Sequence, residues 1–118
     1  MSQTSLLPHP LPDALAELLA ARFRVFSEPM RIKLLDRLRS GEASVQALQE
    51  ATGGSQQNVS KHLGVLLRAG LVTRERDGNL ARYAVADPAV FDLCELVCDG
   101  LQRQLTELQS VLGGGGAA

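Results

Sequence analysis

Apolar side chains recur at intervals of three and four residues along most of the chain, which is the spacing of helices that bury one face. The pattern predicts a first helix from Asp13, a second from Ser27 to Gly41, and a third from Ser44. Asp13, Ser27 and Ser44 suit N-cap positions, and Pro29 suits a first turn. The apolar positions of these helices are, in order, Leu15, Leu18, Leu19, Ala21 and Phe26; Ile32, Leu34, Leu35 and Leu38, which should face the core; and Val45, Leu48 and Ala51.

A fourth helix is predicted from Ser55, and its first turns are polar rather than apolar. The tight turn Thr52-Gly53-Gly54 leads into it from the third helix, so the two helices form a helix-turn-helix pair. Its inward-facing residues are Val59, Leu63, Leu66 and Leu67, and the polar side chains of its exposed head are Gln56, Gln57, Asn58, Ser60, Lys61 and His62.

A β-hairpin is predicted after the fourth helix, which Gly70 ends as a left-handed stop. Its strands are residues 71–76 and 80–85, on either side of the turn signal Asp77-Gly78. The predicted fold is therefore mainly α with a two-stranded β wing. Three arginines lie near the turn of this wing: Arg74, Arg76 and Arg82.

Residues 55–86 have the side-chain chemistry of a unit that reads DNA. Amides of Gln and Asn can pair with adenine edges in the major groove, and Lys61 can reach guanine or phosphate. Ser60 and His62 can hold backbone oxygens. Arginines on the wing neutralise phosphates through an attraction that weakens as salt rises. The predicted DNA-binding residues are Ser55, Gln56, Gln57, Asn58, Ser60, Lys61, His62, Arg74, Arg76 and Arg82.

Three segments together resemble the ArsR/SmtB family of bacterial repressors. They are the run from Phe26 to Leu38 that begins Phe-Ser-Glu-Pro-Met-Arg-Ile, the run Ser60-Lys61-His62-Leu63, and the run Leu66-Leu67-Arg68-Ala69-Gly70-Leu71-Val72. The resemblance covers residues 13–110. It implies a dimeric winged helix-turn-helix protein that binds an inverted repeat in double-stranded DNA and releases it when an inducer binds.

Length and composition are consistent with a single domain. The chain has 118 residues, of which 45% are hydrophobic, enough for one modest core. Residues 1–12 contain Pro8, Pro10 and Pro12 and are expected to form a flexible arm, residues 13–110 the winged helix-turn-helix domain, and residues 111–118 a Gly-rich disordered tail. With neither a membrane span nor a signal peptide in the sequence, the cytoplasm is the expected location.

Charge is distributed unevenly along the chain. The net charge is −1, yet residues 55–86 carry five basic and two acidic side chains, whereas residues 87–118 carry one basic and five acidic side chains. Positive charge is thus concentrated in the predicted reading unit, as expected if one surface meets phosphates.

The last helix is predicted to begin after Asp87 and Pro88 and to carry one apolar stripe. A small domain cannot cover such a stripe, so we expect the helix to pair with its copy, together with the first helix, in a twofold dimer. Twofold symmetry in turn predicts a palindromic operator. The stripe consists of Val90, Cys94, Val97, Leu101, Leu105 and Leu108.

Cys94 and Cys98 are four residues apart on one face of this helix and are the candidates for sensing. Three interpretations are open: packing alone, thiol oxidation or persulfidation, and part of a site for a thiophilic metal ion. Some family members have a Cys-x-Cys pair before the reading helix, but residues 44–51 here contain no cysteine. Others have zinc-binding histidines on the last helix, but residues 87–112 contain no histidine. The inducer, and whether one exists, is therefore open.

Two other classes of function deserve comparison. A winged helix can dock on another protein instead of DNA, and a dithiol pair can belong to a small thiol oxidoreductase. Reactive dithiols usually lie two residues apart at an exposed helix start, whereas Cys94 and Cys98 are four apart and well inside the helix. We therefore expect no enzymatic activity.

Overall fold

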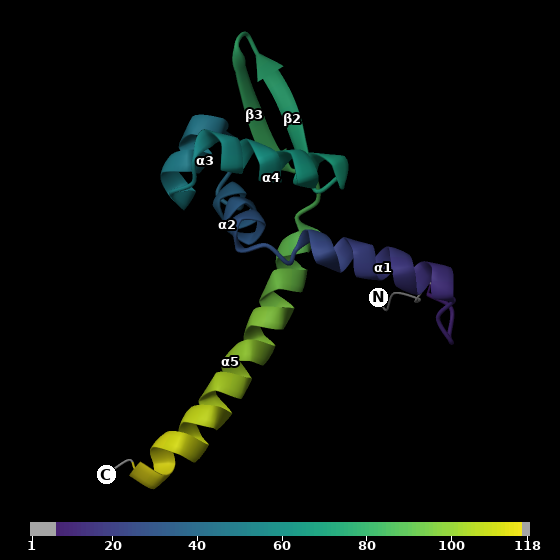
Figure 1. The fold of residues 1–118 in the computed structure, drawn as a ribbon, viewed down its shortest axis with the longest axis vertical. Helices are drawn as coiled ribbons and strands as arrows, with labels where there is room; N and C mark the ends of the chain where they lie inside the picture. The colour runs from purple at the N-terminus through teal and green to yellow at the C-terminus, as the bar shows by residue number, and fades with distance from the viewer. Residues whose placement is uncertain (1–6, 117–118) are drawn as a thin grey trace. The chain divides into compact units, whose positions relative to one another are not determined.

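The computed structural model describes residues 7–116 (Figure 1). Residues 1–6 of the predicted arm and 117–118 of the predicted tail lie outside this range. The contacts within the chain divide it into two compact units, which join between Ala86 and Asp87. The elements are α1 (Asp13–Val25), α2 (Pro29–Leu38), β1 (Ala43–Ser44), α3 (Val45–Thr52), α4 (Gln56–Arg68), β2 (Val72–Asp77), β3 (Leu80–Val85) and α5 (Ala89–Gly116).

The core of the first unit lies between α2, α3, α4 and the sheet. Its apolar side chains include Leu34, Leu35, Leu38, Ala43, Leu48, Val59, Leu63, Leu66, Val72 and Tyr83, each at most 8% exposed. The predicted core residues of α2 are thus confirmed with one exception. Ile32 is 46% exposed, because residues two apart on a helix point to different sides and Leu34 takes the inward position.

The helix-turn-helix pair has the predicted caps. The Ser44 hydroxyl accepts a hydrogen bond from the backbone N–H of Ala47 at 3.2 Å, and the Ser55 hydroxyl accepts one from Asn58 at 3.1 Å. Between the two helices Gly53 has φ of 76°, in the left-handed region that favours glycine. A side chain at Gly54 would place its Cβ 2.8 Å from the Cε atom of Met30, so the turn also needs a second glycine.

Two predicted caps are wrong by one residue. α1 begins at Asp13 itself, with Pro12 as the N-cap, and α2 is capped by Glu28 rather than Ser27. Glu28 precedes Pro29, and a residue before proline is driven into the extended region that an N-cap adopts. The Ser27 hydroxyl instead donates a hydrogen bond to the Arg24 carbonyl at 2.7 Å.

The wing is part of a three-stranded antiparallel sheet in the order β1-β3-β2. The predicted hairpin is confirmed, and the short strand β1 adds to it by pairing with Tyr83 and Arg82 of β3. The loop of the hairpin is Gly78-Asn79 rather than Asp77-Gly78, because Asp77 already pairs with Leu80. Gly78 has φ of 65° and supplies the left-handed position of this two-residue turn.

The second unit consists of α5, whose start is capped as predicted. The Asp87 carboxylate accepts a hydrogen bond from the backbone N–H of Ala89 at 2.9 Å. The helix continues to Gly116, beyond the predicted domain end at residue 110. Four residues of the predicted stripe are 52–56% exposed: Val97, Leu101, Leu105 and Leu108.

No helix within residues 7–116 is long and apolar enough to cross a membrane.

Candidate nucleic-acid interface

The exposed face of α4 presents a row of hydrogen-bonding side chains. Because Val59, Leu63 and Leu66 are completely buried, the helix has one fixed orientation against the core. The first turns therefore point their polar residues to solvent, and the positive end of the helix dipole lies among them. The exposed residues are Ser55, Gln56, Gln57, Asn58, Ser60 and Lys61.

His62 is not part of this exposed row, which corrects the prediction. Its side chain is only 6% exposed, because it lies three residues after Val59 and four before Leu66, on the core side of α4. Its Nδ1 atom lies 3.2 Å from Nη1 of Arg31. Burial lowers the pKa of His62 below 6.5, and the positive charges of Arg31 and Lys61 lower it further against the opposing effect of Glu28.

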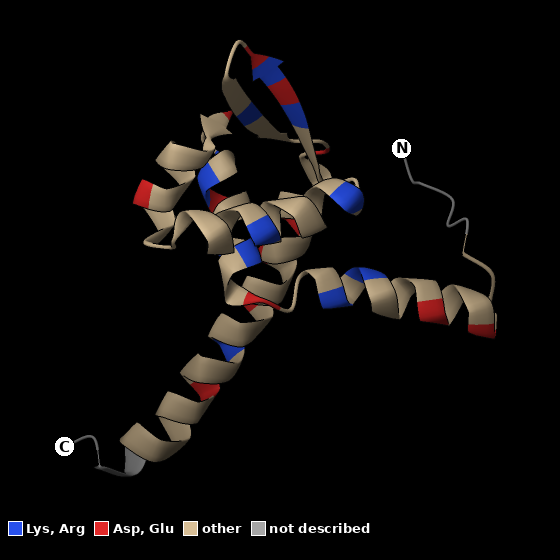
Figure 2. Ribbon diagram, turned by 45° about the horizontal axis from the view of Figure 1, so that its top comes forward, with Lys and Arg blue, Asp and Glu red and all other residues tan. Residues whose placement is uncertain are grey.

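The register of the wing separates the three predicted arginines. Arg74 pairs with the buried Tyr83 and Arg76 with Ala81, so both arginines lie on the face of the sheet that covers the core. Arg82 pairs with Glu75 on the opposite face. Figure 2 shows the resulting alternation of basic and acidic residues along β2.

Arg82 also has a partner outside the hairpin. Its Nη1 atom lies 3.9 Å from Oε1 of Glu42, just before β1, and both side chains are about half exposed. Glu75 is the cross-strand partner of Arg82, so the face of the sheet that carries Arg82 also carries an acidic residue. The three predicted arginines therefore fall into two groups: Arg74 and Arg76 share one face of the sheet, and Arg82 lies on the other face beside Glu42.

An open groove of about 500 Å³ lies beside the exposed row, between α3 and the start of α4. Sequence reasoning did not single out the two glutamines that α3 contributes to it. The sequence could have indicated them, because Gln46 and Gln49 lie two and five residues after the cap Ser44, on the helix that precedes the reading helix. The residues that line the groove are Val45, Gln46, Gln49, Glu50 and Gln56.

The two cysteines are both free thiols on α5. Cys98 is exposed and Cys94 is partly buried. Within residues 7–116, no group of three His, Cys, Asp or Glu side chains lies in an arrangement that could hold a metal ion. The pair alone therefore offers two of the four ligands that a closed tetrahedral site needs.

Comparison with known proteins gives consistent results. Residues 26–75 match a family of helix-turn-helix domains. The chain is 40% identical over 93 residues to the probable mercury resistance operon repressor of Streptomyces lividans, covering 79% of this chain and 71% of that protein. It is 36% identical over 101 residues to the HTH-type transcriptional regulator Rv0081 of Mycobacterium tuberculosis, covering 85% and 89% of the two chains.

The structural neighbours agree with these sequence relatives. The crystal structure of Rv0081 matches with a TM-score of 0.74 at 35% identity, over 81% of this chain and 97% of that one. A homodimeric winged helix-turn-helix DNA-binding domain from Mycobacterium bovis, a possible ArsR-family regulator, matches with a TM-score of 0.67 at 31% identity, over 85% and 95%. The relatives are regulators of transcription rather than enzymes. The chain therefore belongs to the ArsR/SmtB family of winged helix-turn-helix transcriptional regulators.

Proposed function

We propose that the protein is a transcriptional repressor of the cytoplasm that binds an inverted-repeat operator in double-stranded DNA as a homodimer. The observation that carries the proposal is the exposed polar row of α4, held in one orientation by the buried residues beneath it. The 40% identity of the chain to the probable repressor of Streptomyces lividans supports repression rather than activation of transcription.

Base reading is assigned to the first two turns of α4. Gln57 and Asn58 are exposed, and the amide of each can form two hydrogen bonds with an adenine edge. Ser55, Gln56 and Ser60 are assigned to phosphate oxygens, and Lys61 to guanine or phosphate. His62 is assigned an internal role because its side chain is buried.

Phosphate binding by the wing is assigned mainly to Arg74 and Arg76. These two share one face of the sheet, and both are exposed. Arg82 lies on the other face near Glu42 and Glu75, so its charge is partly neutralised within the protein. We therefore expect it to add less to DNA binding than the other two arginines.

Dimerisation is assigned to the apolar stripe of α5 together with α1. On α1, Leu18 is 68% and Phe23 is 56% exposed, and the α5 stripe is about half exposed from Val97 to Leu108. Large apolar side chains at this spacing favour a helical partner, and a twofold dimer covers both surfaces at once. The Mycobacterium bovis neighbour is homodimeric, which supports this assignment.

We further propose Cys94 and Cys98 as the site at which an inducer releases DNA. Cys98 is accessible, and its partner thiol lies one helical turn away. A thiophilic metal ion would bind the two thiols as thiolates, and an oxidant would attack the exposed one first. If a Cys94→Ser, Cys98→Ser double variant still releases DNA with every soft metal and oxidant that acts on the parent, the cysteines serve packing alone, and the inducer acts elsewhere on the protein.

The proposed function is tested by titrating the reduced protein against a labelled duplex from just upstream of its own gene, across a salt series. A scrambled duplex is the control for non-specific binding. We expect selective binding that weakens steeply as salt rises. The absence of selectivity would contradict the proposal and favour a winged helix that docks on a protein.

The matched pair Arg76→Ala and Arg82→Ala tests the assignment within the wing. Arg76 lies on β2 and Arg82 on the neighbouring strand β3, so each variant removes an arginine from a different strand of the hairpin. Arg76→Ala removes one arginine from each protomer of the dimer, so it should flatten the plot of log affinity against log salt by about 1.8, which is about 0.9 for each lost phosphate contact on duplex DNA. Arg82→Ala should flatten it less. Equal slopes for the two variants would contradict the separation of the arginines.

A further inference from the structure

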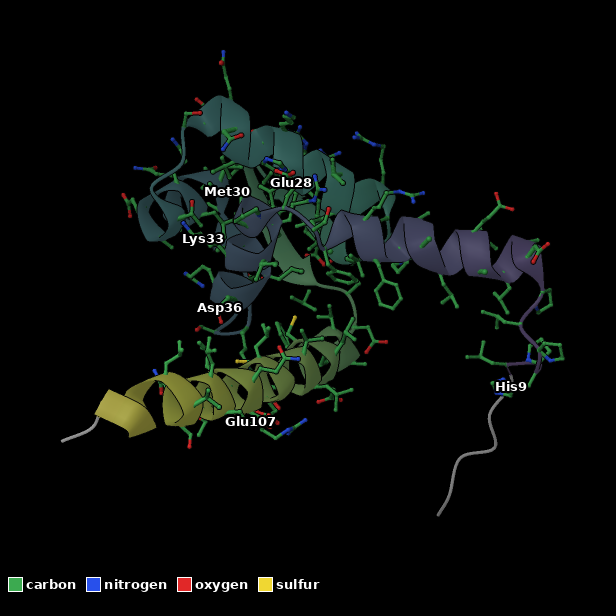
Figure 3. The ribbon with its side chains drawn as sticks, turned by 60° about the horizontal axis from the view of Figure 1, so that its bottom comes forward. His9, Glu28, Met30, Lys33, Asp36 and Glu107 are labelled. Carbon is green, nitrogen blue, oxygen red and sulfur yellow. The ribbon has the colours of Figure 1, made fainter. Side chains whose placement is uncertain are left out.

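Arg31, near the start of α2, contacts two other helices, α1 and α4, through one guanidinium group. Its Nε atom donates a hydrogen bond to the Val25 carbonyl at 2.6 Å, and its Nη2 atom donates one to the Arg24 carbonyl at 3.2 Å. Its Nη1 atom lies 3.2 Å from Nδ1 of His62. Figure 3 shows the beginning of α2, marked by Glu28 and Met30, next to α4. One side chain thus links the C-terminal end of α1 to the middle of α4.

The contact with His62 has a defined chemistry. A guanidinium carries only donors, so Nδ1 of His62 must accept, and the ring is then neutral with its proton on Nε2. Protonation of the ring would remove the acceptor and place a second positive charge beside Arg31. The charged groups that face His62 are Arg31 from α2, Lys61 from α4 and Glu28 from the N-cap of α2. Burial and the two cations keep the pKa of His62 below 6.5.

α1 depends on polar contacts at its end for its direction. No side chain of Asp13–Val25 is fully buried, so packing within the chain does little to hold this helix. The last carbonyls of a helix lack partners within it, and here Arg31 supplies donors to two of them. The same arginine contacts α4 on its buried side, opposite the exposed polar row.

We propose that Arg31 is a positioning residue for DNA recognition: through His62 it fixes α1 relative to the reading helix α4, and so sets the distance between the two reading helices of the dimer. This inference rests on the proposed function, because it assigns α1 to the dimer interface. A dimer that binds two half-sites must hold its reading helices at the spacing of successive major grooves. Loss of the Arg31 contact frees α1 and with it that distance.

The first test needs no DNA. Nitrogen NMR of labelled His62 should show an unprotonated Nδ1 at neutral pH and a pKa below 6.5. Arg31→Gln removes a positive charge and the donor to Nδ1, so the pKa should rise toward 6.5 and the tautomer should no longer be fixed. Arg37→Gln, on the same helix, removes an arginine that donates a hydrogen bond to the Gly41 carbonyl, and it should change neither property of His62. An unchanged His62 in Arg31→Gln would overturn the proposal.

The second test measures binding to operators whose half-sites are moved apart or together by single base pairs. The parent and Arg37→Gln should prefer one spacing. Arg31→Gln should bind that spacing about tenfold more weakly, the scale of one hydrogen bond to a charged group, while losing little at the others. A variant that weakens all spacings equally, or keeps the parental profile, would overturn the positioning role.

Two substitutions of His62 protect the test against misfolding of Arg31→Gln. His62→Asn keeps an acceptor close to the position of Nδ1 and should keep the spacing preference, whereas His62→Leu keeps the burial without the acceptor and should lose it. If both behave alike, the hydrogen bond has no positioning role. If the parent itself binds no operator, the proposed function fails, and the NMR result still shows independently whether Arg31 controls His62.

Discussion

α4 and α5 are both amphipathic helices, but the apolar stripe of α4 is buried and most of the apolar stripe of α5 is exposed. In α4, Leu63 and Leu66 are completely buried within the chain. In α5, Leu101 and Leu105 are 56% and 55% exposed. The periodicity of both stripes is helical, so the pattern alone does not say what covers them. The apolar stripe of α4 is thus buried within the first unit, whereas the stripe of α5 leaves apolar surface that a partner helix can cover.

The comparison predicts its largest effect at Leu63. Leu63→Ala removes buried atoms and leaves a cavity, which should lower the free energy of unfolding by about 2–5 kcal/mol. Leu108→Ala removes the same atoms from the exposed stripe and should act chiefly by weakening the dimer. Chemical denaturation at several protein concentrations separates the two, because only the dimer term depends on concentration. Equal losses that are independent of concentration would break the comparison.

A charge on the α5 stripe should affect assembly rather than folding. Leu105→Glu would place a carboxylate in the dimer interface, where burying an unpaired charge is costly, and should give a monomer at micromolar concentration. Thr106→Glu adds the same charge one residue later, off the stripe, and is the control. Sedimentation measures the assembly state, and circular dichroism should show that both variants keep their helices. A dimeric Leu105→Glu protein would contradict the assignment of the stripe.

The exposed and buried faces of α4 are expected to affect different properties, namely DNA sequence preference and the free energy of unfolding. Asn58→Ala should cost about 1–3 kcal/mol for each half-site of the specific operator and relax its sequence preference, because each protomer loses one bidentate base contact. It should leave the free energy of unfolding almost unchanged, unlike Leu63→Ala on the other face of the same helix. Competition binding against operator variants measures the preference. Equal weakening on all sequences would instead assign Asn58 to phosphates.

The smallest effect is expected from the buried polar residue of α4. The pKa of His62 in the folded protein is lower than its value of 6.5 in the unfolded chain, so the folded state favours the neutral ring. The stabilisation is therefore fully present above pH 6.5 and is lost as the pH falls through the folded-state pKa. Thermal unfolding of the parent and of His62→Asn across this range checks it, and the variant should show a weaker dependence. Identical profiles would mean that His62 does not contribute.

Much of the reading unit could be predicted from the sequence, because local signals agree there. Ser55 caps α4, its apolar residues have one period, and Gly70 has the left-handed φ of 76° expected of a stop. β1 escaped prediction because two residues show no alternation, and only the return of β3 creates the pairing. Hydrophobicity alone predicts Ile32 in the core, but its position around the axis of α2, two residues before the buried Leu34, turns it toward solvent.

Two of the predicted DNA-binding residues differ from the rest of the set in the structure, for different reasons. His62 stands among polar neighbours, and its spacing from Val59 and Leu66 was the overlooked sign of burial. Arg82 is separated from Arg74 and Arg76 by the observed register, in which it pairs with Glu75, whereas strands 71–76 and 80–85 paired end to end would place it opposite Arg74. Its partner Glu42 is distant in sequence, so that contact needed the structure.

The short strand β1 also gives the wing unequal stiffness along its length. Pairing with β1 covers β3 only at Arg82 and Tyr83, so the sheet is three-stranded at the middle of β3 and two-stranded from Ala81 to the tip. Two-stranded ribbons twist more readily than wider sheets. We therefore expect the part of the wing that pairs with β1 to stay fixed to the helix-turn-helix pair, and the tip with Arg76 and Gly78 to adjust to the width of a DNA groove. A rigid body with a compliant end can keep its register on the bases and still adapt to the shape of the backbone.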